Sequence, residues 1–178
     1  MLKNKVTIGG NIMKFKYLII SLIVLALATG AVIAAEQATV GDYTFTVPDG
    51  FTVTNQSEDT TFLQIDDDHA IVISAPGAEG SPEQFKAELE KDGYEFGSEG
   101  NYTTSNYTIN QYNYVKDDYQ GYFYVCHTDL DPDDADEDLI MITYVIPSDE
   151  DAPSDDNPVN QIIGSLAKAD IDNDADDD

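Results

Sequence analysis

The sequence contains no tryptophan, no arginine and a single cysteine, Cys126. One cysteine excludes an internal disulfide framework and any zinc site built from several thiolates. Basic residues are scarce, since eight lysines stand against 35 aspartates and glutamates and the formal net charge is −27. A nucleic-acid-binding protein needs a basic surface to displace counterions from phosphates, so the composition argues against that class.

The first 35 residues contain no acidic side chain. Four of the eight lysines lie before residue 17, and residues 17–35 form an uncharged run, YLIISLIVLALATGAVIAA, that ends in small side chains. A positive segment followed by an apolar segment and a small-residue end is typical of a secretory signal peptide. We therefore expect residues 1–35 to direct export, with cleavage after Ala34 or Ala35.

Two alternatives for this segment remain open. Met13 is followed by Lys-Phe-Lys, which is a more usual start for a signal peptide than the residues after Met1. The apolar run is also nearly as long as the roughly 20 residues that span a membrane, so an uncleaved anchor competes with a cleaved signal. Contact with the membrane is then expected only through this segment. Under either interpretation the protein is extracellular or associated with the cell envelope.

The exported part is strongly acidic. Residues 36–178 hold 35 acids and four lysines, and so carry a net charge of −31. We interpret this excess as a solubilising surface that repels anionic partners. Three Asn-x-Ser/Thr sequons, at Asn55, Asn101 and Asn106, lie in polar stretches where surface loops are expected. Behind a signal peptide, these three asparagines are candidate glycosylation sites.

Several stretches alternate apolar and polar residues with the period of a β-strand. They lie at 43–47, 51–54, 61–65, 70–74 and through 107–127. Within the last stretch, turns are expected at 110–111 and 117–121, and the acidic residues 66–68 with His69 are expected to close a hairpin turn. Residues 139–146 are apolar in both phases, which is typical of a strand buried on two faces at the centre of its sheet.

Two segments show the period and the end signals of helices. Ser81 is followed by proline and, three residues on, by Gln84, which forms a capping box and predicts a helix over residues 82–92. Asn157 is likewise followed by proline, and apolar residues at helical spacing predict a second helix over 158–168. Each helix has one apolar face that must be covered.

Two amphipathic helices need a sheet to pack against, and a strand that is apolar on both sides needs cover on both faces. The sequence therefore predicts an α+β fold in which a mostly antiparallel sheet of about six to eight strands is packed by the two helices, as in an α/β/α sandwich. This single domain is expected over residues 36–168. Residues 169–178 are expected to form a disordered acidic tail.

This order of elements resembles the α/β/α sandwich of the PsbP-like photosystem subunits and related small exported bacterial proteins. The resemblance covers most of residues 41–168 and includes an opening strand–proline–turn phrase at 43–51, YTFTVPDGF. It implies a non-catalytic accessory or assembly role, and it supplies no motif whose residues can be carried over. The chain also resembles small secreted archaeal proteins, a resemblance that implies no mechanism.

Residues 129–138 hold seven carboxylates in ten positions. Alternate carboxylates suit Ca²⁺, which takes six to eight oxygen ligands. The segment departs from an EF-hand because Asp134 stands where that motif has glycine and Ile140 where it has glutamate. A looser Ca²⁺ or Mg²⁺ site in a loop between strands and an ordinary solvated loop both remain open. The candidate ligands are Asp129, Asp131, Asp133 and Asp136.

The sequence has eleven tyrosines, and seven of them lie between residues 102 and 124. Alternate tyrosines on paired strands form a ladder whose rings bury area while the hydroxyls stay wet. Such a ladder is either an aromatic platform for a partner or the ordinary result of the strand propensity of tyrosine. The candidate platform consists of Tyr112, Tyr114, Tyr122 and Tyr124.

No set of residues in the sequence predicts catalysis. Cys126 and His127 are neighbours on a predicted strand, so their side chains point to opposite faces and do not form a nucleophile–base pair. The Gly-x-Ser-x-Gly and His-Glu-x-x-His motifs and a phosphate-binding glycine loop are absent from the sequence. We therefore predict no catalytic residue, and no cofactor apart from Ca²⁺ in the acidic loop.

Three functional hypotheses follow from the sequence. The first is an exported, non-catalytic binding or accessory domain of the cell envelope, whose partner is an envelope protein or a glycan. The second is an extracellular module that depends on Ca²⁺ bound by residues 129–138. The third is an extracellular hydrolase, for which no convergent acid, base and nucleophile can be named.

Overall fold

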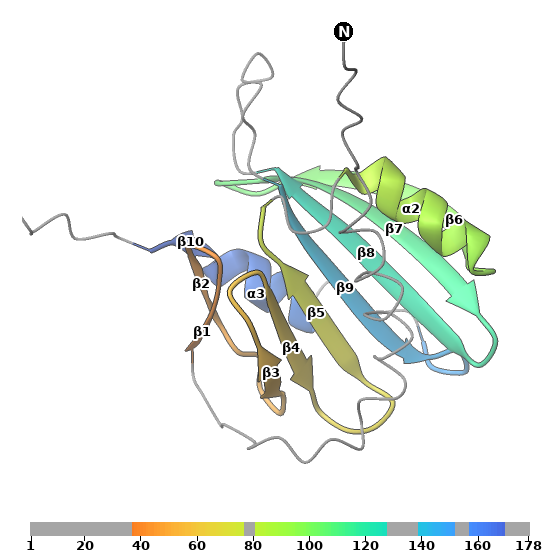
Figure 1. The fold of residues 1–178 in the computed structure, drawn as a ribbon, viewed down its shortest axis with the longest axis horizontal. Coiled ribbons are helices and arrows are strands. Elements are labelled where there is room, and N and C mark those ends of the chain that lie inside the picture. The colour runs from red at the N-terminus through yellow and green to blue at the C-terminus, as the bar shows by residue number, and fades with distance from the viewer. Residues whose placement is uncertain (1–36, 77–80, 128–138, 152–156, 170–178) are drawn as a thin grey trace, which may run out of the picture. The chain divides into compact units, whose positions relative to one another are not determined.

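The computed structural model of the protein describes residues 37–76, 81–127, 139–151 and 157–169. Within these ranges, seven strands form one antiparallel main sheet (Figure 1). In spatial order they are β3 (Thr52–Gln56), β4 (Thr60–Gln64), β5 (Ala70–Ser74), β9 (Leu139–Pro147), β8 (Tyr119–His127), β7 (Thr108–Lys116) and β6 (Glu95–Thr103). The predicted α+β class and the antiparallel sheet are confirmed.

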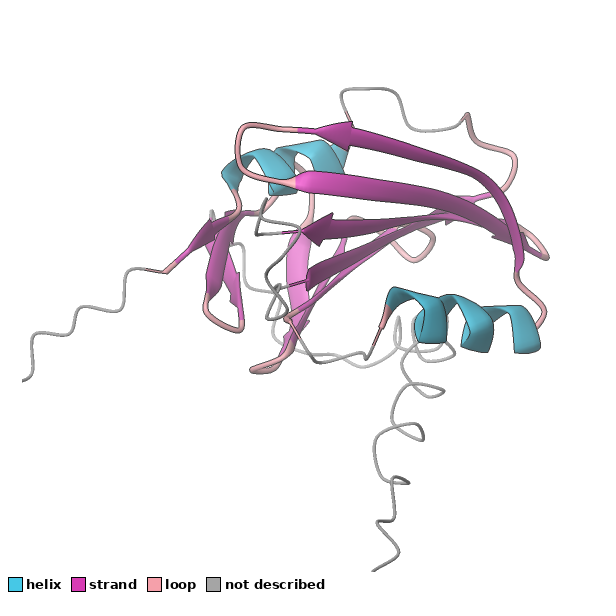
Figure 2. Ribbon diagram, turned by 90° about the horizontal axis from the view of Figure 1, so that it is seen from above, coloured by secondary structure: helices cyan, strands magenta, loops and turns pink. Residues whose placement is uncertain are grey.

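Three further strands form a second, smaller sheet that the sequence analysis did not predict. Its order is β1 (Gln37–Val40), β2 (Tyr43–Thr46) and β10 (Ala167–Lys168). The two described helices are α2 (Pro82–Lys91) and α3 (Pro158–Ser165). Figure 2 shows α2 on one face of the main sheet and α3 on the opposite face. We call these faces the α2 face and the α3 face.

A hydrophobic core lies on the α3 face, where α3 and the small sheet cover the main sheet. Burying each large apolar side chain there contributes roughly 1.5–3 kcal/mol. Its fully buried members include Phe45, Leu63, Ile71, Ile73, Ile109, Ile140, Ile142 and Ile162. On the α2 face, Phe85 of α2 packs on Phe123 of β8 with ring centroids 4.4 Å apart.

β9 occupies the centre of the seven-stranded order, as its doubly apolar sequence predicted. Ile140 and Ile142 belong to the core on the α3 face and are fully buried. Met141, between them, points to the opposite face and is also buried. A strand that is covered on both faces carries apolar side chains on both, which is why the central position of β9 could be predicted from its apolar sequence alone.

The predicted helix starts are confirmed. The Ser81 hydroxyl accepts a hydrogen bond from the Gln84 backbone, and the Gln84 side chain accepts from the Ser81 backbone, which completes the capping box. The Asn157 side chain accepts from two backbone amides of α3, those of Val159 and Asn160. At the far end of α2, Gly93 adopts a positive φ of 91°, the conformation expected of a glycine that ends a helix.

The end predicted for the second helix is wrong. α3 stops at Ser165, and the next residues become the short strand β10, in which Ala167 pairs with Thr44 of β2. Leu166 is buried in the core although its backbone is extended. Its spacing from the apolar residues of α3 therefore fits a helix and a covering strand equally well, and the sequence pattern could not separate the two.

The strand prediction also fails at the polar edge of the sheet. β6 was not predicted, because every one of its side chains except Phe96 is exposed and the segment shows no alternation. The turn expected at 110–111 lies inside β7, where Asn110 pairs with Val125 and Gln111 with Tyr124 of β8. Pairing with a neighbouring strand holds these two polar residues in a ladder that their own propensities disfavour.

Candidate functional site

Several predicted features fall outside the described residues. These are the signal segment at 1–35, the predicted acidic tail at 169–178 apart from Ala169, and the proposed Ca²⁺ ligands Asp129, Asp131, Asp133 and Asp136. In the four described ranges, no group of three or more histidine, cysteine, aspartate or glutamate side chains is arranged to hold a metal ion. Neither α2 nor α3, the two helices described, is long and apolar enough to cross a membrane.

The structure divides the four tyrosines of the predicted platform between the two faces of the sheet. Tyr112 and Tyr114 of β7 face α2, whereas Tyr122 and Tyr124 of β8 belong to the core on the α3 face. Only Tyr112 is partly exposed, since the exposed fractions of the other three are 4%, 6% and 1%. The predicted platform is therefore wrong. β7 pairs Tyr112 with Phe123, and a register that differs by one residue moves a whole set of side chains to the other face.

Tyr114 has a structural role that its neighbours on the sheet define. Its ring lies over Gly121 of β8, where any Cβ atom would overlap it. The same ring contacts Tyr94 and Phe96, with centroids 5.4 Å and 5.6 Å away. Complete burial raises the pKa of Tyr114, so its hydroxyl stays protonated. Tyr114 therefore anchors β6 and β7 to β8, and its burial keeps it from contacting a ligand that binds from solvent.

An open hollow of about 260 Å³ lies on the α2 face of the edge hairpin formed by β6 and β7. We call it the β6–β7 hollow. In the register of the two strands, Glu99 stands opposite Tyr112 and Asn101 opposite Asn110, so four side chains form a square on one face. The hollow is lined by Glu99, Gly100, Asn101, Asn110 and Tyr112.

Lys86 of α2 pairs with one of the residues that line this hollow. Its Nζ atom lies 2.7 Å from Glu99 Oε1 and 5.2 Å from the centroids of the Phe96 and Tyr112 rings. The hydrogen bond to Glu99 raises the pKa of Lys86, so the ammonium group stays charged and balances the carboxylate. The ring of Tyr112 is held from another side by stacking on Phe123, with centroids 5.8 Å apart.

His127 lies at the other end of the square. The Asn110 amide nitrogen is 2.9 Å from His127 Nε2, and in this orientation the amide donates and the ring nitrogen accepts. The neighbouring Cys126 points to the opposite face and is fully buried, as predicted. Burial raises the pKa of its thiol to about 12, so the sulfur is protonated at neutral pH and is a poor nucleophile.

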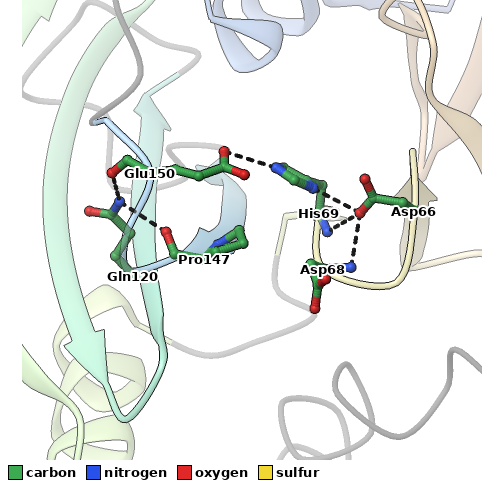
Figure 3. A network of polar contacts seen from close by, with 6 residues as sticks. All are labelled: Asp66, Asp68, His69, Gln120, Pro147 and Glu150. Atoms are coloured by element: carbon green, nitrogen blue, oxygen red, sulfur yellow. Dashed lines mark hydrogen bonds and ion pairs between the residues drawn. The ribbon is translucent and has the colours of Figure 1, made fainter.

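A second polar cluster lies away from the hollow, and we call it the His69 clamp (Figure 3). His69 Nδ1 is 2.8 Å from Asp66 Oδ1, and His69 Nε2 is 3.0 Å from Glu150 Oε2. Asp66 Oδ1 also accepts hydrogen bonds from the backbone amides of Asp68 and His69, which closes the β4–β5 hairpin turn as predicted. The clamp thus ties this turn to the segment after β9.

The clamp continues into β8. The Gln120 side-chain nitrogen donates to the backbone oxygens of Glu150 at 2.7 Å and Pro147 at 3.1 Å. Partial burial lowers the pKa of His69, but the hydrogen bonds to Glu150 and Asp66 outweigh it, and the net shift is upward. The hydrogen bond from His69 lowers the pKa of Asp66. The ring is therefore held between two carboxylates as an imidazolium.

The three sequon asparagines are all exposed, but they differ in their settings. Asn106 lies in the turn between β6 and β7, whereas Asn55 lies in β3 and Asn101 in β6. Two of the three sites are thus on strands, although surface loops were expected. Asn101 is the one that also lines the β6–β7 hollow.

Of the residues that line the hollow, only Asn101 and Tyr112 were candidate site residues from the sequence, and neither for this role, whereas Asn110 was expected in a turn. Glu99 and its partner Lys86 were missed because polar side chains in an acidic chain are too common to stand out. One signal was present, since Lys86 is among only four lysines after residue 35. No protein-family model and no curated protein matches this chain.

Proposed function

We propose that this chain is an exported, non-catalytic binding domain of the cell envelope, and that the β6–β7 hollow is its contact site. The observation that carries the proposal is the square of Glu99, Asn101, Asn110 and Tyr112, whose polar groups face an open hollow on the exposed edge of the main sheet. Export rests on the leader-like pattern of residues 1–35.

The states of the cysteine and the two histidines support binding over nucleophilic chemistry. The Cys126 thiol is buried and protonated. Both ring nitrogens of His69 are occupied by carboxylates, and Nε2 of His127 is occupied by the Asn110 amide. A nucleophile needs a base within hydrogen-bond reach. The two histidine rings are instead hydrogen-bonded to carboxylates and to an amide. An accessory role is also what the PsbP-like resemblance implies.

Photocrosslinking in native cells tests the contact site. A photoreactive residue at position 101 of the exported protein is expected to give a discrete adduct, because that side chain lines the hollow. The matched control places the same residue at position 118, an exposed site in the β7–β8 turn at the opposite end of β7. An adduct at 101 that is lost in Asn110→Ala, and absent at 118, supports the proposal. Equal adducts at both positions, or none at 101, contradict it.

A further inference from the structure

The charges around the β6–β7 hollow favour a neutral ligand. Glu99 is its one charged lining residue, and the Lys86 ammonium group 2.7 Å away balances that charge. The exported chain as a whole carries −31, so its field repels an anion before the anion reaches the hollow. A cation would have to compete with Lys86 for the same carboxylate. A neutral polar molecule meets neither obstacle.

The hydrogen-bonding groups of the hollow are mixed in kind. The amides of Asn101 and Asn110 each carry donors and an acceptor, the Glu99 carboxylate only accepts, and the Tyr112 hydroxyl does both. Side chains directly opposite on paired strands have Cβ atoms about 4.5–5.5 Å apart. A ring that carries several hydroxyl groups, each a donor and an acceptor, satisfies such a closely spaced mixed set.

The size and rigidity of the hollow agree with a single ring. Its volume of about 260 Å³ is below the roughly 300–1,000 Å³ of pockets for drug-sized ligands. Tyr112 is held in place by Phe123 and by Lys86, so the aromatic wall is pre-organised. A fixed wall lowers the entropy that a ligand loses on binding, and its carbon atoms suit the C–H groups of a sugar.

We infer that the β6–β7 hollow binds a neutral sugar ring, an inference that rests on the proposed function and specifies its ligand. The ring has two possible sources. One is a glycan of the envelope or of a partner. The other is a glycan attached to Asn101 itself, because Asn101 both lines the hollow and belongs to the sequon that Thr103 completes. The chemistry recognised is the same in both cases.

The variant Thr103→Ala separates these sources, because it removes the sequon and keeps the Asn101 side chain. The exported Thr103→Ala protein is titrated by NMR with glucose, galactose, mannose and N-acetylglucosamine, and with glucuronate and glucosamine at the same concentrations. At least one neutral sugar is expected to shift the side-chain amide signals of Asn101 and Asn110 in a saturable way. Glucuronate and glucosamine are expected to bind at least tenfold more weakly.

Two further variants in this background locate the site. Asn110→Ala is expected to weaken sugar binding at least tenfold, whereas Gln111→Ala, on the opposite face of the same strand, is expected to change it less than twofold. If Asn110→Ala does not fold, Tyr112→Phe replaces it, because it removes only a hydroxyl group. A Tyr112→Phe protein is expected to bind at least threefold more weakly.

Mass spectrometry of the wild-type Asn101 peptide identifies the source. A sugar mass on Asn101 assigns the hollow to the chain's own glycan, and an unmodified Asn101 together with binding of free sugar assigns it to an external glycan. The inference is overturned if no neutral sugar binds Thr103→Ala, if a charged sugar binds more tightly, or if Gln111→Ala weakens binding as much as Asn110→Ala. If sugars fail while the adduct at position 101 persists, only the ligand class is wrong. If the adduct is also absent, the proposed function falls with it.

Discussion

The β6–β7 hollow and the His69 clamp are built from similar side chains, but the hollow is open and the clamp is closed. Both contain a carboxylate, a basic group and an amide. The hollow lies on a face of the main sheet, whereas the clamp joins the β4–β5 turn to the segment after β9. In the clamp, each nitrogen of the His69 ring meets a carboxylate of the same chain, and the group is closed. In the hollow, two lining residues have partners outside it, Glu99 with Lys86 and Asn110 with His127, and the space that the lining residues enclose stays open. The comparison shows that residue type alone does not distinguish a structural cluster from a binding site.

The two clusters also differ in how their carboxylates are paired with cations. The clamp inserts one cation between two carboxylates, which relieves repulsion between Asp66 and Glu150 and fixes two segments to each other. The hollow pairs one cation with one carboxylate and leaves a neutral surface. We therefore expect changes in the clamp to alter stability, and changes in the hollow to alter binding.

The largest expected effect comes from the sheet surface beside the hollow, where the Tyr114 ring lies over Gly121. Gly121→Val introduces a side chain into space that the Tyr114 ring occupies, and the ring must leave its contacts with Phe96 and Tyr94. Overpacking of this kind costs about 3 kcal/mol, which lowers the melting temperature by roughly 10 °C. Circular dichroism melts of the exported protein measure the change.

The matched control is Gly100→Ala, since a Cβ atom there meets nothing within 4 Å. We expect its melting temperature to stay within about 2 °C of the wild type, the range of a surface substitution. Equal losses in the two variants would show that β6 and β7 are not anchored through Tyr114. The division between the structural contact of Tyr114 with Gly121 and the neighbouring binding surface would then be lost.

The second prediction concerns how the stability that the clamp contributes depends on pH, and it does not involve the hollow. The folded-state pKa of His69 is raised, so its contribution is complete below the unfolded value of about 6.5 and is lost as the pH rises through the folded value. The pKa of Asp66 is lowered, so its contribution is present above the unfolded value of about 3.9 and is lost as the pH falls through the folded value. The clamp is therefore strongest between about pH 4 and 6.5.

His69→Gln measures this window. The variant leaves Asp66 and Glu150 without their cation. Because these carboxylates are 56% and 47% exposed, water replaces it in part, and we expect the two lost pairs together to cost about 1–2 kcal/mol at pH 6. The difference is expected to shrink between pH 6 and pH 9, because the wild type loses the imidazolium there. Denaturant unfolding at several pH values checks both statements. A difference in stability that stays constant or grows toward pH 9 contradicts an imidazolium held between the two carboxylates. A change in sugar binding in His69→Gln contradicts the independence of the clamp from the hollow.

The sequence predicted the fold best where burial or capping acts locally. β9 was placed at the centre of its sheet because both of its phases are apolar, and α2 was bounded correctly to within one residue because Ser81 and Gly93 define its ends. β6 and β10 were missed for a shared reason. Their residues, apart from Phe96, are exposed, and each segment is a strand only because a neighbour pairs with it, β7 for β6 and β2 for β10. An exposed strand lacks the apolar–polar alternation that identifies a half-buried one.

The candidate site was harder to predict than the fold for the same reason. The square of Glu99, Asn101, Asn110 and Tyr112 depends on the register of β6 against β7, which contains an irregularity between Phe96 and Glu99. One residue of slip of β6 against β7 would send Glu99 and Asn101 to the other face. The tyrosine platform was predicted wrongly for the same reason. Period-2 alternation shows which residues of one strand share a face, but not which residues of the neighbouring strand lie on that same face.

The smallest expected effect on stability, and the sharpest test of the comparison, comes from Lys86. An exposed ion pair contributes about 0–1 kcal/mol and a cation–π contact about 0.5–1 kcal/mol, so Lys86→Met is expected to cost at most about 1–2 kcal/mol, its methylene groups still covering Phe96. Its effect on the ligand is larger, because Glu99 then faces the hollow without a counter-charge. We expect the preference among sugars to move from neutral rings toward glucosamine, whose ammonium group replaces that of Lys86.

The matched control is Lys91→Met at the exposed end of the same helix, which removes the same charge from the chain without removing the partner of Glu99. If the preference for glucosamine rises equally in Lys91→Met, the net charge of the protein governs the ligand and the hollow has no electrostatic character of its own. If it rises only in Lys86→Met, the neutrality of the hollow is set locally by one ion pair, just as the stability of the clamp is set by one imidazolium between two carboxylates.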